Sequence, residues 1–116
     1  MNILKKSGEL NFKQIYELSK SPEIQKMSTV KGQDLEIESF LAYEDTNNTT
    51  GEPQTIVSIR TTDGETFATN SKTFTREFMD ILTMCEEANA PMPKVVGVIA
   101  RTSRAGREFI TCTYKG

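Results

Sequence analysis

The chain has 116 residues, a formal net charge of −2 and 36% hydrophobic residues, which suits one small globular domain with a modest core. It has no apolar run long enough for a membrane span and no apolar secretory segment near its start, so we expect a cytoplasmic protein without a membrane partner. The absence of histidine removes Ser-His-Asp and Cys-His nucleophile systems, and two distant cysteines, Cys85 and Cys112, indicate buried thiols and neither a zinc site nor a disulfide framework.

Two short helices are predicted near the N-terminus. Residues 11–20 and 21–27 each begin with a residue type that caps helices, and Pro22 stands at a first helical position. We therefore expect residues 1–30 to form a helical extension of a barrel over residues 31–116, within a single domain overall.

A long bent strand is predicted over residues 32–45. Apolar residues alternate at Leu35 and Ile37, and the alternation breaks around residues 39–41, as at a bulge that bends a strand. The stretch TNNTTGEPQ, residues 46–54, is rich in turn-forming residues and predicts a flexible loop.

The dipeptide Asp63-Gly64 predicts a tight hairpin between two β-rich runs. Asp-Gly favours a two-residue type I′ turn, because both central positions need positive φ. This turn would place Ile59 opposite Ala68 on the core face and Arg60 opposite Phe67 on the other face.

A helix is predicted between Ser71 and Pro91. Ser71 or Thr73 can cap its start, and Asn89 with the prolines that follow ends it. The apolar residues at helical spacing are Phe74, Phe78, Ile81, Leu82 and Cys85. We assign both phenylalanines to the core.

Residues 93–115 predict a second hairpin, with Ser103 to Gly106 as its loop. Pairing across this loop would put Ile99 opposite Ile110 on the core face. The other face would carry Val96, Val98 and Phe109. Two half-apolar faces mean that the hairpin is covered on both sides or meets a partner, and a slip of one residue would exchange the faces.

The expected order is one long strand, two strands, a helix and two strands. This is the order of a mainly β OB-fold, a five-stranded Greek-key barrel with a helix between strands 3 and 4, here with short N-terminal helices added. Ligands of such barrels bind over strands 2 and 3, between the loops that join strands 1 to 2 and 4 to 5.

Basic residues gather at the second of these loops. Arg101, Arg104 and Arg107 surround the turn of the second hairpin, where they can contact a phosphate backbone although the whole protein is mildly acidic. The alternative is a solubilising tip in which Arg101 pairs with Glu108 across the strands.

Arg60 beside Phe67 supplies a charge and a stacking ring on the predicted strand face. The alternative is a solvated arginine over a phenylalanine that fills a gap at the barrel rim. Three further candidates for nucleic-acid binding are Lys72, Tyr43 and Phe109. Tyr43 can instead close the barrel, and Phe109 can instead serve a dimer contact.

Two segments resemble the OB-fold single-stranded DNA-binding proteins of bacteriophages, particularly phages of Gram-positive hosts. They are TIVSIRTTDGETFATNSKTFTREFMDIL and VVGVIARTSRAGREFITCTY, and the likeness covers residue 31 to the C-terminus. It implies a non-enzymatic protein that coats single-stranded DNA in phage DNA replication or recombination, in the host bacterial cytoplasm. It also implies a homodimer or higher oligomer, and no cofactor or metal. The chain departs from such proteins in lacking tryptophan and an acidic C-terminal tail, which puts in doubt the recruitment of replication or recombination proteins through a tail.

Two other functions stay open at this stage. A protein-binding OB module would use the apolar hairpin face of Val96, Val98 and Phe109. A carboxylate enzyme would use Glu36, Glu38 or Asp63, but no nucleophile or pocket motif supports it, and the outward-facing pair of Glu36 and Glu38 on a strand is typical of a solvated edge.

Overall fold

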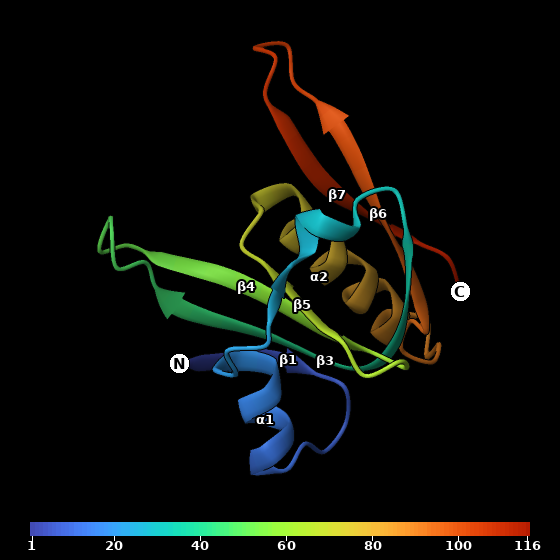
Figure 1. The fold of residues 1–116 in the computed structure, drawn as a ribbon. Helices are drawn as coiled ribbons and strands as arrows, with labels where there is room; N and C mark the ends of the chain where they lie inside the picture. The colour runs from blue at the N-terminus through green and yellow to red at the C-terminus, as the bar shows by residue number, and fades with distance from the viewer.

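A curled sheet of seven strands forms the body of the protein (Figure 1). The computed structural model describes residues 1–116. The strands are β1 (Asn2–Lys6), β2 (Gln25–Lys26), β3 (Asp34–Thr46), β4 (Pro53–Thr61), β5 (Thr66–Thr69), β6 (Val95–Thr102) and β7 (Glu108–Tyr114). The α-helices are α1 (Phe12–Ser19) and α2 (Lys72–Glu87), and a 3-10 helix, η1, spans Met27–Val30. The chain is therefore mainly β, and neither α-helix is long and apolar enough to cross a membrane.

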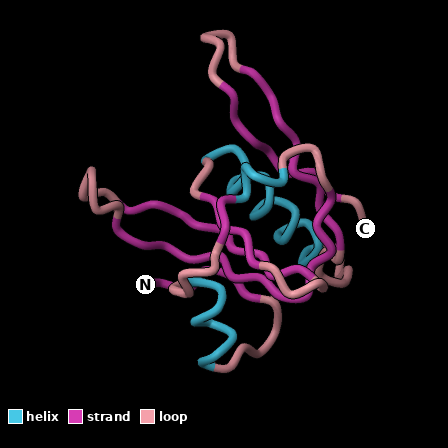
Figure 2. The backbone as a smooth tube through the Cα atoms, viewed as in Figure 1, coloured by secondary structure: helices cyan, strands magenta, loops and turns pink.

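Strand β3 organises the sheet, whose order is β2-β5-β4-β3-β6-β7. One edge of β3 pairs with β4, and its other edge pairs with β6 through Asp34 to Glu36 and with β1 through Leu41 to Glu44. The register with β4 shifts between Ile37 and Ser39, which confirms the predicted bulge and bend. The bend curls the sheet into a half-barrel, traced as a backbone in Figure 2.

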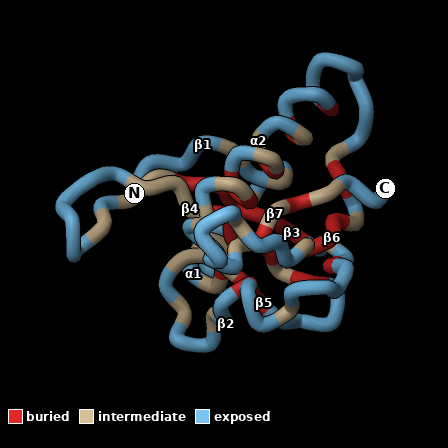
Figure 3. The backbone as a smooth tube through the Cα atoms, turned by 90° about the horizontal axis from the view of Figure 1, so that it is seen from above, coloured by how far each residue is buried: buried red, intermediate tan, exposed pale blue.

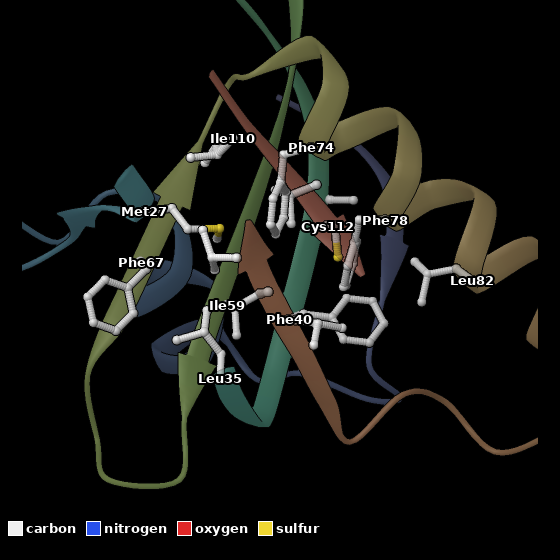
Figure 4. Close-up of a cluster of buried hydrophobic side chains, with 14 residues drawn as sticks. Met27, Leu35, Phe40, Ile59, Phe67, Phe74, Phe78, Leu82, Ile110 and Cys112 are labelled. Carbon is white, nitrogen blue, oxygen red and sulfur yellow. The ribbon is translucent and has the colours of Figure 1, made fainter. Parts of the chain in front are cut away.

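Helix α2 packs on the inner side of the curled sheet. Phe78 meets Phe40 of β3 edge to face, with ring centroids 5.2 Å apart, and stacks on Phe74 at 6.3 Å (Figure 4). These rings are fully buried, as predicted for both helix phenylalanines. Burial follows the middle of the sheet, whereas the loops at its ends are exposed (Figure 3).

The half-barrel stays open between β5 and β7, which do not pair with each other. Two hydroxyl groups at the start of α2 bridge this opening. Ser71 and Thr73 both donate to the carbonyl of Ile110 in β7, at 3.1 Å and 2.7 Å. Because Ser71 also accepts from the Phe74 N–H, the same residue caps the helix and ties it to the sheet.

The turn between β4 and β5 is one residue longer than predicted. The Thr61 N–H donates to the Glu65 carbonyl and the Gly64 N–H donates to the Thr61 carbonyl, with Gly64 at φ +90°. This is a type I turn followed by a glycine bulge, not a type I′ turn. Ile59 consequently lies opposite Phe67, so the predicted register is wrong by one residue.

The turn between β6 and β7 has the same construction. The Ser103 N–H donates to the Arg107 carbonyl, the Gly106 N–H donates to the Ser103 carbonyl, and Gly106 has φ +82°. Val98 therefore lies opposite Cys112, and the predicted pairing of Ile99 with Ile110 is wrong. Val96 and Val98 point into the core, so the expected apolar patch of Val96, Val98 and Phe109 does not form.

The first predicted helix of the N-terminal segment is present as α1. Asn11 and Gln14 form a capping box, in which each side chain accepts from the other residue's backbone N–H. The second predicted helix, residues 21–27, is wrong. That segment instead forms β2, parallel to β5, and leads Met27 into the core, because the free edge of β5 offers backbone partners that local sequence does not reveal. Strand β1 was not predicted.

Cys85 and Cys112 are buried free thiols, as predicted. Burial, and then the nearby Glu77 carboxylate, raises the pKa of Cys112 to about 12. Between the ordinary thiol range and pH 12 the folded protein therefore keeps a proton that the unfolded chain loses.

The Cys112 thiol makes stability depend on alkaline pH. Its contribution is complete below about pH 8.5 and is lost as the pH rises toward 12, because the unfolded state binds fewer protons there. We expect the free energy of unfolding of the native protein to fall more steeply above pH 9 than that of Cys112→Ala, by up to about 1.4 kcal/mol per pH unit. Urea denaturation at several pH values with a reductant present measures this, and parallel curves would contradict it.

The hydroxyl bridge predicts a second effect on stability. Thr73→Val should lower the free energy of unfolding by about 1 kcal/mol, because it removes a hydrogen bond and keeps the shape of the side chain. Thr83→Val is the matched control on the exposed side of α2, and it should change the free energy of unfolding by less than about 0.5 kcal/mol. Equal effects in urea denaturation would argue against the bridge.

Candidate nucleic-acid interface

Two hairpin arms project from the half-barrel, one to the left and one upward in Figure 1. The first arm consists of the ends of β3 and β4 with the loop of residues 47–52, and the second consists of the ends of β6 and β7 with the loop of residues 103–107. The start of α2 lies between them. Lys72 lines a pocket with residues of the first arm and its loop, and its neighbours Ser71 and Thr73 donate to the Ile110 carbonyl of β7. The region between the arms is called the inter-arm surface below.

The second arm carries three exposed arginines, Arg101, Arg104 and Arg107, and none of them forms an ion pair. The alternative pairing of Arg101 with Glu108 is not found, because Glu108 pairs with Lys31. Arg101 instead lies directly opposite Phe109. Directly opposed residues in an antiparallel pair share one face, so this arm places a guanidinium and an aromatic ring together.

Arg60 and Phe67 do not share a surface. Phe67 is only 3% exposed and packs in the core, because the longer turn sets it opposite Ile59. Arg60 faces outward, where its guanidinium lies 3.4 Å from the Glu17 carboxylate and 3.9 Å from that of Glu38. The predicted exposed pair is therefore wrong, and two carboxylates already neutralise the charge of Arg60.

Tyr43 is buried where α1 meets the outer face of β3, in a small apolar cluster with Leu18 and Leu41. Burial, and then the Asp45 carboxylate, raises its pKa above the ordinary tyrosine value. Its side chain also lines an open pocket of about 510 Å³ with Lys26 and others. Tyr43 thus helps to hold α1 on the sheet while one edge of it borders this pocket.

Lys72 lines a second open pocket, of about 450 Å³, together with Glu52 and other residues of the first arm and its loop. The two pockets adjoin, since Gln54 and Asn70 line both. The Asn70 amide donates to the Gln54 side chain at 3.0 Å and so fixes the polar side chains between them. The pocket of Lys26 and the pocket of Lys72 therefore lie side by side, on either side of Gln54 and Asn70.

Six basic residues have no carboxylate within ion-pair distance: Lys26, Lys72, Lys94, Arg101, Arg104 and Arg107. Three of them lie on the second arm, Lys72 begins α2 between the arms, and Lys26 lines the pocket that adjoins the pocket of Lys72. Every other lysine or arginine is paired with an acidic side chain. The free positive charge of an acidic protein is thus concentrated beside the two arms.

Sequence reasoning missed Lys26, because it placed this residue in a helix. Its position follows from the pairing of β2 with β5, which no local sequence pattern predicts. No three histidine, cysteine, aspartate or glutamate side chains cluster in a way that could hold a metal ion.

A model of the phi29-type family described as phage single-stranded DNA-binding protein matches residues 10–115, nearly the whole chain. No curated protein and no solved structure matches the chain.

Proposed function

Because the chain belongs to the phi29-type family of phage single-stranded DNA-binding proteins, we propose that it coats exposed single strands during phage DNA replication or recombination, without marked sequence preference. We locate the binding surface from one observation, which is the concentration of unpaired cations beside the arms. Lysine and arginine bind a strand by neutralising phosphates and releasing counterions, and cations already held by carboxylates gain less from such contacts.

The arrangement of elements supports an OB-fold. Strands β3, β4 and β5, helix α2 and strands β6 and β7 follow one another in the order of that barrel, with β1, β2 and α1 as additions. The two arms then correspond to the loops that flank the ligand in OB-folds, namely those joining strands 1 to 2 and 4 to 5. The unpaired cations lie beside the same two loops.

We place the strand across the inter-arm surface. Arg104 and Arg107 at the tip of the second arm, with Lys72 between the arms, contact phosphates. Phe109 stacks a base, and Arg101 beside it adds charge and a planar surface. Tyr43 borders the path at the pocket that it shares with Lys26. Arg60 and Phe67 are left out, because the first is neutralised and the second is buried.

The arginines at the tip of the second arm should control the salt dependence of binding. We expect Arg104→Ala with Arg107→Ala to weaken the affinity for poly-dT and to flatten the plot of log K against log salt by up to about two units, one per lost phosphate contact. Titration of each variant at several salt concentrations gives the slope.

The matched control for this double variant is Arg76→Ala with Lys115→Ala. It removes the same charge at two exposed residues outside the second arm, one in α2 and one after β7, which lie near Glu77 and Asp34. We expect its slope to stay near that of the native protein. Equal flattening in both double variants would show that overall charge, and not the inter-arm surface, governs binding.

We expect Phe109 to contribute base stacking to the affinity and to have little effect on its salt dependence. Phe109→Leu keeps an apolar side chain but removes the ring, so we expect an affinity loss of about fivefold or more for oligothymidylate with an unchanged salt slope. Thermal unfolding checks that the variant stays folded. Native affinity in a folded Phe109→Leu protein would rule out base stacking at this position.

A further inference from the structure

Helix α1 exposes two aromatic side chains. Phe12 is 83% exposed and Tyr16 is 44% exposed, and their spacing of four residues places them on the same face of the helix. The opposite side of α1 holds it in place, through the buried Leu18 and the partly buried Ile15. The fold therefore does not need the two rings for its core.

Two lysines border these rings. Lys13 and Lys20 lie within one turn of Tyr16, and their side chains are 85% and 63% exposed. Each makes only a long ion pair, Lys13 with Glu17 at 3.9 Å and Lys20 with Asp45 at 3.8 Å. Exposed pairs of this kind contribute about 1 kcal/mol or less, so a phosphate can replace the carboxylate. We call Phe12, Lys13, Tyr16 and Lys20 the α1 ridge.

The α1 ridge is linked to the first arm through Lys20. Its ammonium lies 3.8 Å from the carboxylate of Asp45 near the end of β3. Lys13 and Tyr16 line a pocket of about 760 Å³ that includes Gln25, and the next residue of β2, Lys26, lines the pocket of Tyr43 on the other face of that strand. A strand that passes the first arm at Asp45 can therefore reach the α1 ridge by way of Lys20.

Carboxylates on the same side of the molecule constrain this path. Glu17, Glu23 and Glu65 line the pocket between α1 and the sheet. These carboxylates disfavour a polyanion deep in this pocket. Lys13 and Tyr16 line the same pocket, whereas Phe12 and Lys20 lie outside it, so a strand would contact the exposed parts of the ridge and would not enter the pocket.

We propose that the α1 ridge is a second contact for the same single strand, with bases stacked on Phe12 and Tyr16 and phosphates beside Lys13 and Lys20. This inference rests on the proposed function and extends it. Aromatic side chains flanked by cations are the combination that binds unpaired nucleotides without sequence preference, because every base has a π-face. The ridge lengthens the bound segment beyond what the arms hold.

A tryptophan reporter tests the stacking directly. The chain contains no tryptophan, so Phe12→Trp introduces a single indole on the ridge. Met84→Trp is the matched control, because Met84 is 67% exposed on α2, away from the ridge. We expect saturating oligothymidylate of about 20 nucleotides to quench the fluorescence of Phe12→Trp and to leave that of Met84→Trp unchanged. Equal responses of the two variants, or no response at position 12 while DNA binds, would overturn the proposal.

Oligonucleotide length separates this inference from the proposed function. Phe12→Ala with Tyr16→Ala should bind an oligothymidylate of about 20 nucleotides more weakly by about fivefold or more, but should bind one of about 8 nucleotides like the native protein. If the variant bound both lengths with native affinity, the proposal for the α1 ridge would be overturned and the proposed function would stand. Failure of the native protein to bind either length would overturn the proposed function and the ridge with it.

Sedimentation velocity of the same double variant tests the other use of an exposed aromatic surface, contact with a second copy of the chain. Loss of self-association together with native affinity for the longer oligonucleotide would assign the rings to protein contact and overturn the proposal. We expect unchanged sedimentation and weaker binding of the longer oligonucleotide.

Discussion

The architecture depends on one strand that pairs along both edges while it bends. The shift between Ile37 and Ser39 lets β3 keep β4 on one edge and give its other edge first to β6 and then to β1. Because the two ends of β3 point in different directions, the hairpins attached to them diverge as two arms. The same bend creates the concave side that Phe74 and Phe78 of α2 fill. A flat sheet would offer neither the arms nor the concave surface.

Charge pairing, and not net charge, determines which cations of this protein are free of a carboxylate partner. The formal charge is −2, yet the carboxylates are distributed so that they pair with most cations of the sheet and the helices and leave those of the second arm, with Lys26 and Lys72, free. Arg60 shows the effect, since Glu17 of α1 and Glu38 of β3 both reach it. Salt screens long-range fields within about 10 Å, so a strand beside Arg104 responds to the local cations more than to distant acidic groups.

The element types were predictable, but the faces of the hairpins were not. Periodicity and caps predicted α1, α2, the bent strand and both hairpins, because these signals lie within a few residues of one another. The faces depend on the loop length. Gly64 at positive φ fits both a two-residue turn and a three-residue turn with a bulge, and the loop before Arg107 has three residues where four were predicted. One residue of difference buried Phe67 and moved Arg101 next to Phe109. An aromatic ring directly opposite an arginine is therefore found in the second hairpin and not in the first.

The sequence by itself determined the class of fold, the capped helices, the basic tip of the second arm and the likeness to phage strand-binding proteins, since each is written in contiguous residues. Only the tertiary structure decided that β1 and β2 cover open edges, that Glu17 neutralises Arg60, and that Lys26 reaches the surface beside Lys72. These features join residues that are distant along the chain. They arise because unpaired backbone edges and charges must find partners, and the folded chain alone determines which partners are within reach.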